Sequence, residues 1–254
     1  MAPGGRNARR EEDFGFTMKV IFAGPTFHGA TLLPAAGYEL RPPARQGDFF
    51  QAVDDGANVI GLVDGVYEYV PSIWHKEILF GLAQGVQVFG AASMGALRAA
   101  ECAAFGMVGI GRIYDDCVSG ALEDDAEVAQ SHAPAELGFL PLSEPLVNVR
   151  ATIAHCLLLG CISGAEHDRL LETAKAIFFK DRTYKLLVQS CISDDKRASG
   201  VLAALRINSV NQKLLDARLL VDAVVKASDR RLVPSFDWTF EATSFWNAAF
   251  PSSR

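Results

Sequence analysis

Short apolar runs alternate with amphipathic stretches in the N-terminal part of the chain, and this alternation predicts strands and helices in turn. The apolar runs are bounded by Gly, Pro or Asp, as is typical of buried strands. They predict strands at residues 19–23, 38–40, 58–63 and 86–90. Helical spacing follows at residues 47–55 and 72–84, and again from Ser93. Helices that follow buried strands at this interval indicate βαβ units, so we expect an α/β fold with a mostly parallel sheet flanked by helices.

The pattern changes in the C-terminal part, where the apolar spacing becomes that of helices nearly to the end. The predicted helices span residues 146–159, 165–179, 186–192, 200–207 and 209–228. We therefore expect a leader at residues 1–17, an α/β core at 18–143 and a helical region at 144–254 packed on that core. Five aromatic residues near the end are expected to pack in the core or at a subunit contact: Trp238, Phe240, Phe245, Trp246 and Phe250.

Composition narrows the class of protein. The chain has 254 residues, of which 50% are hydrophobic and 21% charged, which suits one large domain or two small ones. Its net charge is −6 and no basic cluster is interleaved with aromatics, so we expect no nucleic-acid partner. No apolar run is long enough to cross a bilayer, and the polar leader does not resemble a secretory signal. These features predict a cytoplasmic protein without a membrane partner.

The cysteines and histidines do not predict a metal or another cofactor. The five cysteines contain no C-x-x-C pair, and the five histidines lack a metal-ligand spacing such as H-E-x-x-H. Reduced cysteines that pack as small hydrophobic side chains also fit a cytoplasmic protein.

Small and polar residues stand where the predicted strands end. Those ends carry Gly24-Pro25-Thr26, Asp64-Gly65 and Ala92-Ser93. Because functional sites in parallel sheets lie at the carboxyl ends of the strands, we expect these segments to converge on one site.

Ser93 has the setting of a nucleophile at a sharp strand-to-helix turn. The segment that surrounds it is a relaxed form of G-x-S-x-G, with Ala91 at the first glycine and Gly95 at the second. Such a turn exposes the serine hydroxyl beside the first amides of a helix, which can stabilise an oxyanion. The alternative is a tight turn that carries a solvated serine.

A serine nucleophile needs a base, and the sequence offers histidine or lysine. The histidine candidates are His28, His75 and His132. The lysine candidate is Lys76, which lies on an apolar stripe of its predicted helix. A desolvated ammonium has a lowered pKa and can act as a neutral amine. Alternatively, the Lys76 stem covers apolar surface while its ammonium reaches water.

Supporting roles can be assigned to six further residues. The amide of Met94 is the expected first oxyanion donor, and Gly24 and Thr26 are candidates for a second. Asp64 is expected either to orient the lysine or to cap a helix. Arg98 and Glu101, three residues apart on one helix, are expected to pair with each other.

Several segments together resemble the TfuA family. The resemblance covers residues 19–155, and its most specific part is the block A-S-M-G-A-L-R-A-x-E that contains Ser93. The other stretches are Phe22-Ala23-Gly24-Pro25-Thr26, Trp74-His75-Lys76-Glu77-Ile78-Leu79, Leu122-Glu123-Asp124-Asp125-Ala126-Glu127-Val128-Ala129 with His132, and Val147-Asn148-Val149-Arg150-Ala151-Thr152.

The resemblance implies a function, partners and a catalytic pair that the spacing of residues alone does not. TfuA proteins accompany YcaO enzymes, which use ATP to activate a peptide backbone amide so that sulfur can replace its oxygen. The TfuA partner hydrolyses a C-terminal thiocarboxylate on a ubiquitin-like sulfur carrier protein, releases sulfide, and strengthens the grip of YcaO on its ribosomal peptide substrate. The Ser–Lys pair of the family falls on Ser93 and Lys76.

Two other functions remain open at this point. One is a non-catalytic adaptor that docks on YcaO and presents the peptide. The other is a nucleotide-binding α/β domain, against which the missing G-x-G-x-x-G and G-x-x-x-x-G-K-[ST] patterns argue.

Overall fold

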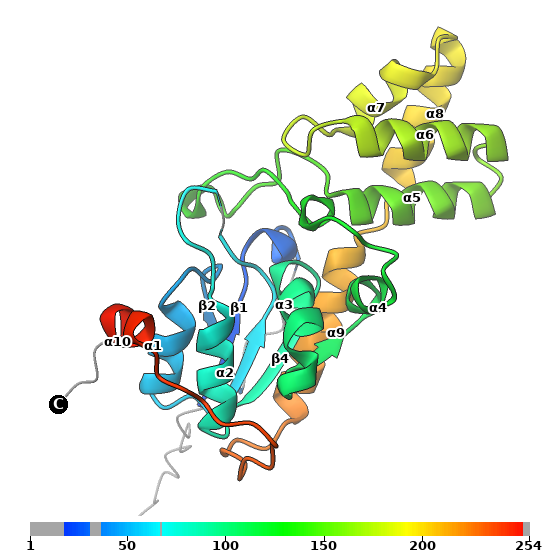
Figure 1. Ribbon diagram of the computed structural model, residues 1–254. Helices are drawn as coiled ribbons and strands as arrows, with labels where there is room; N and C mark the ends of the chain where they lie inside the picture. Colours follow the sequence, from blue (N-terminus) through cyan, green and yellow to red (C-terminus); the bar gives the residue numbers. More distant parts are fainter. Residues whose placement is uncertain (1–17, 31–36, 67, 251–254) are drawn as a thin grey trace, which may run out of the picture.

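A computed structural model describes residues 18–30, 37–66 and 68–250, and the leader predicted at 1–17 lies outside these ranges. Five parallel strands form one sheet in the order β2-β1-β3-β4-β5 (Figure 1). The strands are β1 (Lys19–Phe22), β2 (Glu39–Arg41), β3 (Val59–Leu62), β4 (Gln87–Ala91) and β5 (Val108–Ile110). The predicted parallel sheet is confirmed.

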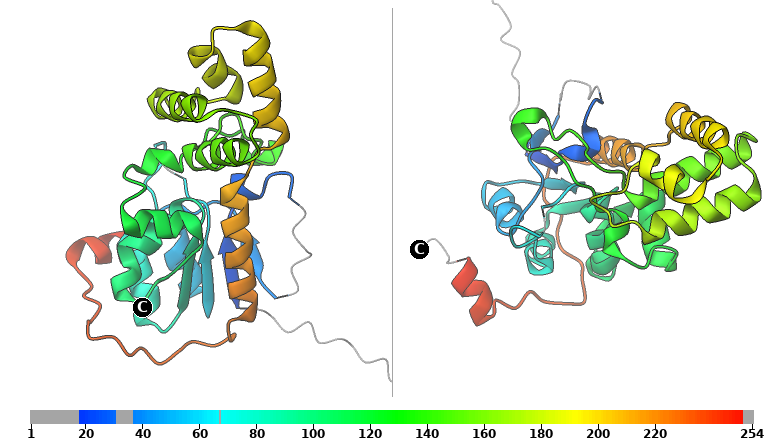
Figure 2. Two further views of the ribbon diagram at one scale, coloured as in Figure 1. Left: turned by 90° about the vertical axis from the view of Figure 1, so that its right-hand side faces the viewer. Right: turned by 90° about the horizontal axis from the view of Figure 1, so that it is seen from above.

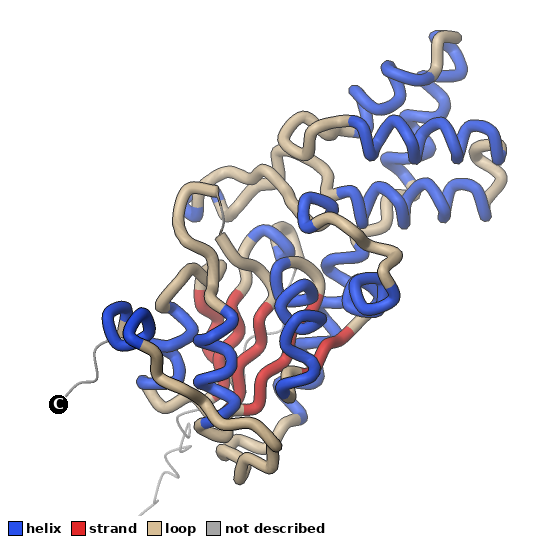
Figure 3. The backbone as a smooth tube through the Cα atoms, viewed as in Figure 1, coloured by secondary structure: helices blue, strands red, loops and turns tan. Residues whose placement is uncertain are grey.

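Helices cover both faces of this sheet, as the tube drawing and the turned views show (Figures 2 and 3). One face packs against α1 (Asp48–Asp54), α2 (His75–Ala83) and α3 (Met94–Cys102). The other face packs against α9 (Gln212–Lys226). Side chains alternate along β1 accordingly: Val20 and Phe22 join the core with α1 to α3, whereas Ile21 packs with α9. Burial on both faces explains why the strands read as continuous apolar runs.

A separate group of helices projects from the carboxyl end of the sheet (Figure 1). It consists of α5 (Leu146–Leu158), α6 (Gly164–Ala176), α7 (Tyr184–Cys191) and α8 (Asp195–Ile207), which share their own apolar core. The C-terminal part is thus helical, as predicted. Its helix α9 returns to the sheet, because its buried stripe fits the face that α1 to α3 leave open.

Two elements lacked a clear sequence signal. The edge strand β5 is only three residues long, with Val108 largely exposed and a glycine at its centre. Helix α4 (Arg112–Ser119) buries only Ile113 completely, so its apolar stripe is narrow. Both are positioned by their neighbours: β5 pairs with β4, and the carboxylate of Asp216 on α9 accepts a hydrogen bond from the Ile113 amide.

The chain ends in an irregular segment that leads to the short helix α10 (Ser244–Ala249). The aromatic side chains of Phe240, Trp246 and Phe250 stack around Phe50 and Phe80 of α1 and α2. This cluster satisfies the expected packing role of the aromatic tail, although Phe245 remains 78% exposed. Among the described residues, no helix is both long and apolar enough to cross a membrane.

Gly95 allows α3 to approach β3 closely, and its replacement should test this packing. A Cβ at Gly95 would lie 1.8 Å from the Leu62 carbonyl oxygen, whereas one at Gly200 in α8 would meet nothing within 4 Å. We expect Gly95→Ala to lower the free energy of unfolding by about 3 kcal/mol. Gly200→Ala should raise it by up to about 1 kcal/mol because alanine favours a helix interior. Urea unfolding of both variants measures the contrast, and equal stabilities would contradict it.

Candidate functional site

Ser93 occupies the sharp turn between β4 and α3, as the sequence predicts. The residue before it, Ala92, has φ of 69°, a backbone conformation that is costly for residues other than glycine. Ser93 is the N-cap of α3, yet its hydroxyl caps no amide and makes no hydrogen bond to another described residue. The side chain is 9% exposed and lines a cavity of about 330 Å³. The hydroxyl is therefore sheltered but available to a ligand in that cavity.

Four segments distant in sequence enclose this cavity. The loop after β3 contributes Asp64 to Val66 with Glu68 and Tyr69, and residues 128–134 contribute Gln130 and His132. Phe179 and Lys180 come from the loop before α7, and Lys213 comes from α9. The expected convergence of the strand ends at Asp64 and Ser93 is thus observed, and the helical region completes the enclosure.

Lys213 is the buried cation of the site. Its side chain is 2% exposed, and its Nζ donates a hydrogen bond to the Val128 carbonyl oxygen at 3.2 Å. The nearest carboxylate oxygen is Oδ1 of Asp64, 3.9 Å away. Burial lowers the pKa of Lys213, and the charge of Asp64 opposes that shift. The neutral form of the Lys213 amine is therefore more favoured in the folded protein than it is for a lysine in water.

Asp64 organises the neighbouring strand end. Its Oδ2 accepts hydrogen bonds from the amides of Gly24 and Thr26 at 2.9 and 3.0 Å, and its Oδ1 accepts one from the Thr26 hydroxyl at 2.6 Å. The carboxylate thus caps the short 3-10 turn η1 (Pro25–Phe27) and also faces a lysine, which is Lys213. Because the Gly24 and Thr26 amides are engaged by Asp64, they are not free to stabilise an oxyanion, contrary to the expectation from sequence.

The Met94 amide lies beside Ser93 at the first position of α3. Within the described part of the chain it has no hydrogen-bond acceptor, whereas the next amide, that of Gly95, donates to the Val63 carbonyl oxygen at 3.1 Å. A free amide next to the serine suits an oxyanion donor, and this role of Met94 stays a prediction.

Lys76 lies outside the serine cavity. Its Nζ is 3.3 Å from the Thr243 hydroxyl and 5.5 Å from the centroid of the Phe240 ring, both in the C-terminal segment. The apolar stripe that Lys76 shares is covered by the aromatic tail and not by the strand that leads to Ser93. The structure thus brings Lys213, in place of Lys76, to the cavity of Ser93.

The other residues around Lys76 have structural roles. His75 Nε2 lies 2.7 Å from Glu101 Oε2, and Arg98 Nη1 donates to the same oxygen at 2.6 Å, which confirms the expected Arg98–Glu101 pair. Glu77 accepts hydrogen bonds from the amides of Gly47, Phe50 and Trp74, so one carboxylate serves the starts of α1 and α2. Burial raises the pKa of Glu77, although these hydrogen bonds oppose the shift.

His132 is the histidine candidate that lines the serine cavity. Its Nδ1 lies 2.8 Å from the Ala133 carbonyl oxygen, and its ring contacts Phe139 edge to face. A carbonyl oxygen accepts but does not donate, so Nδ1 carries the proton and Nε2 keeps a lone pair in the neutral ring. His132 is therefore a second candidate base. His28 lies apart from this cavity, with its Nδ1 2.8 Å from the Gly138 carbonyl oxygen.

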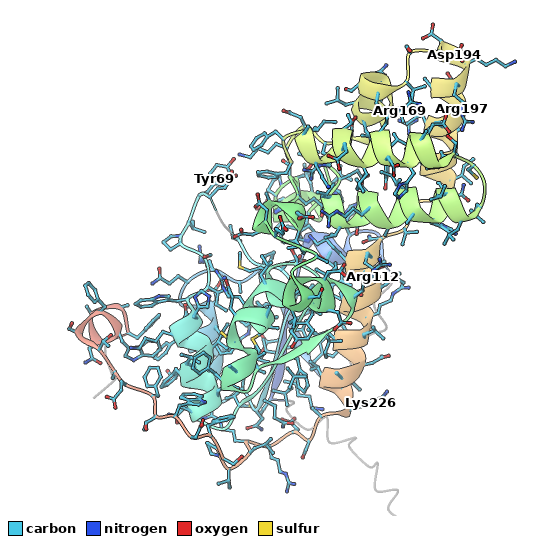
Figure 4. The ribbon with its side chains drawn as sticks, turned by 45° about the vertical axis from the view of Figure 1, so that its right-hand side comes forward. Tyr69, Arg112, Arg169, Asp194, Arg197 and Lys226 are labelled. Carbon is cyan, nitrogen blue, oxygen red and sulfur yellow. The ribbon has the colours of Figure 1, made fainter. Side chains whose placement is uncertain are left out.

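The loops at the mouth of the cavity are held together by Lys180. Its Nζ is 2.8 Å from Glu68 Oε2 and lies over the rings of Tyr69, Phe178 and Phe179 at 5.4 to 5.8 Å from their centroids. Figure 4 shows Tyr69 extending from its loop toward the helical region. The mouth thus joins the α/β core to the helical region.

Sequence reasoning missed Lys213, although a signal was present. Lys213, Ala217, Leu220 and Val224 stand at positions i, i+4, i+7 and i+11 of α9, and all four are buried. This spacing places Lys213 on the apolar stripe, as the same reasoning placed Lys76 on its own stripe. Among the described residues, no group of three or more His, Cys, Asp or Glu side chains is placed to hold a metal ion, and the five cysteines are free.

The fold and site define a parallel α/β protein with a serine at a strand-to-helix turn, facing a cavity that also contains a buried lysine. A family model described as TfuA-like protein matches residues 64–183, which supports membership in that family. The match includes Asp64, Ser93 and His132, whereas Lys213 follows it in the sequence. No curated protein matches the chain.

The lowered pKa of Lys213 predicts a pH dependence of stability. Between its folded pKa and about 10.4 in the unfolded chain, the unfolded state binds more protons, so stability should rise with pH. We expect the free energy of unfolding of wild type, relative to Lys213→Met, to increase from neutral pH toward pH 10. The slope is at most about 1.4 kcal/mol per pH unit. Lys196→Met, at an exposed site, controls for the general effects of replacing a lysine. The expectation would be contradicted if the difference in unfolding free energy between wild type and Lys213→Met did not change with pH.

Proposed function

We propose that this protein hydrolyses a thiocarboxylate at the C-terminus of a ubiquitin-like sulfur carrier protein and thereby supplies sulfide to a YcaO enzyme that thioamidates a ribosomal peptide. The observation that carries the proposal is that Ser93, at its strained turn, and the buried Lys213 line one cavity at the carboxyl edge of the sheet. The match to the TfuA-like family model supports the choice of substrate and partner.

The proposed reaction has two steps. In the first, the neutral amine of Lys213 takes the proton of the Ser93 hydroxyl, and Oγ attacks the carbonyl carbon of the thiocarboxylate. The C–S bond breaks, the proton passes from Lys213 to sulfur, and hydrosulfide leaves an acyl-serine. In the second, Lys213 takes a proton from water, whose oxygen attacks the acyl carbon. The bond between that carbon and Oγ breaks, Oγ takes the proton from Lys213, and the carrier leaves as a carboxylic acid that gives its remaining proton to solvent.

The surroundings suit these charges. The Met94 amide lies beside Ser93 and would donate to the developing oxyanion. The cavity of about 330 Å³ is small, so it suits a slender chain end better than a folded surface.

His132 is an alternative acceptor for the proton of the Ser93 hydroxyl, because it lines the same cavity and its Nε2 is unprotonated in the neutral ring. We favour Lys213 because its burial lowers the pKa of the amine, whereas the ring of His132 is only partly buried. Both assignments keep Ser93 as the nucleophile.

Four substitutions test the site. We expect Ser93→Ala and Lys213→Met each to lower the rate of sulfide release from a thiocarboxylated carrier by about 10³-fold or more, as for other serine nucleophiles and their bases. Lys76→Met should stay within about twofold of wild type because Lys76 contacts only the C-terminal segment. His132→Gln is the comparison that separates the two bases. Sulfide is measured by a colorimetric assay, and the acyl-serine by mass spectrometry.

The outcomes distinguish hydrolysis from the adaptor function. If Ser93→Ala blocks thioamidation with the carrier but not with added sulfide, the protein acts as the hydrolase. If Ser93→Ala supports thioamidation from the carrier at the wild-type rate, the hydrolytic proposal fails and the adaptor function takes its place. The assignment of the base would be overturned if Lys76→Met lost most of its sulfide release while Lys213→Met kept the wild-type rate.

A further inference from the structure

A second cavity lies on the other side of Lys213. Its volume is about 420 Å³, and it shares Pro25, Gln130 and Lys213 with the serine cavity. The rest of its lining comes from Thr26 and His28 at the turn after β1, from Pro141, from the starts of α5, α7 and α9 and from the end of α8. The hydrolysis described above uses none of these other residues.

The charges around this cavity are mainly positive. Lys185 and Arg206 reach it from the helical region. Within the described chain, neither Lys185 nor Arg206 has an ion-pair or hydrogen-bond partner for its side chain, so both cationic groups are available to a ligand. Among the described lining residues the single acidic one is Glu144, and burial raises the pKa of its carboxyl.

Neutral hydrogen-bonding groups complete the lining. The side chains of Asn148 and Asn211 bond to each other, with Nδ2 of the first 3.1 Å from Oδ1 of the second, and this bond fixes the edge beside Lys213. The first turns of α7 and α9 also border the cavity and add their partial positive charge to that of the side chains. A cavity of this size with unpaired cations and few acids suits an anionic ligand of small-molecule size.

We propose that this second cavity binds a small oxyanionic ligand, carrying either phosphate or carboxylate groups, through Arg206 and Lys185. It is a site separate from the serine cavity, and the two meet at Lys213. A ligand there would lie beside the wall that holds the proposed base, so its occupancy is expected to alter the turnover at Ser93. This last consequence rests on the proposed function, whereas binding itself does not.

Isothermal titration calorimetry with inorganic phosphate and with citrate tests the site. We expect wild type to bind at least one of the two. The probe that binds more tightly identifies the ligand class as phosphate or carboxylate. Arg206→Glu and Lys185→Glu should each weaken that binding tenfold or more, because an attractive charge becomes repulsive. Both residues are exposed, so the fold should tolerate the changes. Lys196→Glu makes the same charge change on α8 outside the cavity and should stay within about twofold of wild type.

Two further variants complete the test. Glu144→Gln removes the acidic side chain of the cavity and should tighten binding. Ser93→Ala should bind the probe as wild type does, so loss of hydrolysis with retained binding separates this inference from the proposed function. The inference is overturned if wild type binds neither probe at 10 mM, or if Lys196→Glu weakens binding as much as Arg206→Glu. Circular dichroism of each variant verifies the fold.

Discussion

The burial of Lys213 against Asp64 is the constraint on which the site depends. Asp64 follows the central strand β3, holds the turn after β1 through the Gly24 and Thr26 amides, and faces Lys213 from α9. Taking two charges out of water costs more than their attraction returns unless hydrogen bonds satisfy them. Asp64 meets this condition with three hydrogen bonds, whereas Lys213 has one to a carbonyl oxygen, and its lowered pKa reduces the remaining cost. The burial that costs folding free energy therefore also favours the neutral form of the Lys213 amine.

Close backbone packing places the serine beside this pair. The Gly95 amide donates to the Val63 carbonyl oxygen, and the absent side chain of Gly95 lets α3 lie against the end of β3. Ala92 adopts its left-handed conformation in a turn that leaves only two residues, Ala92 and Ser93, between β4 and α3. A larger residue at either position would separate α3 from β3, and with it Ser93 from Asp64. The small residues around Ser93 are therefore required by the geometry of the turn.

Sequence patterns predict those structural features that depend on residues close together in the chain. The buried strands β1, β3 and β4 and the turn at Ser93 follow from apolar runs and small residues, and the structure confirms them. The choice between Lys76 and Lys213 is different, since both stand on apolar stripes of their helices. What covers each stripe depends on contacts between residues far apart in sequence: aromatic residues near the C-terminus cover that of Lys76, and the sheet covers that of Lys213. Helical periodicity shows that a lysine faces an apolar layer, but it does not show which layer.

The helical region is part of the site because it sets the position of α9. The Lys213 amide donates to Asn148 Oδ1 of α5 at 3.1 Å, and the Val210 amide donates to the Thr152 hydroxyl of the same helix at 2.9 Å. These bonds fix the start of α9 relative to α5, and thereby fix the amine of Lys213 in the wall of the serine cavity. Lys180, from the loop between α6 and α7, closes the mouth of that cavity against Glu68. A protein that bound the helical region and shifted α5 or the α6–α7 loop would therefore act on both the proposed base and the entrance of the cavity, without touching Ser93.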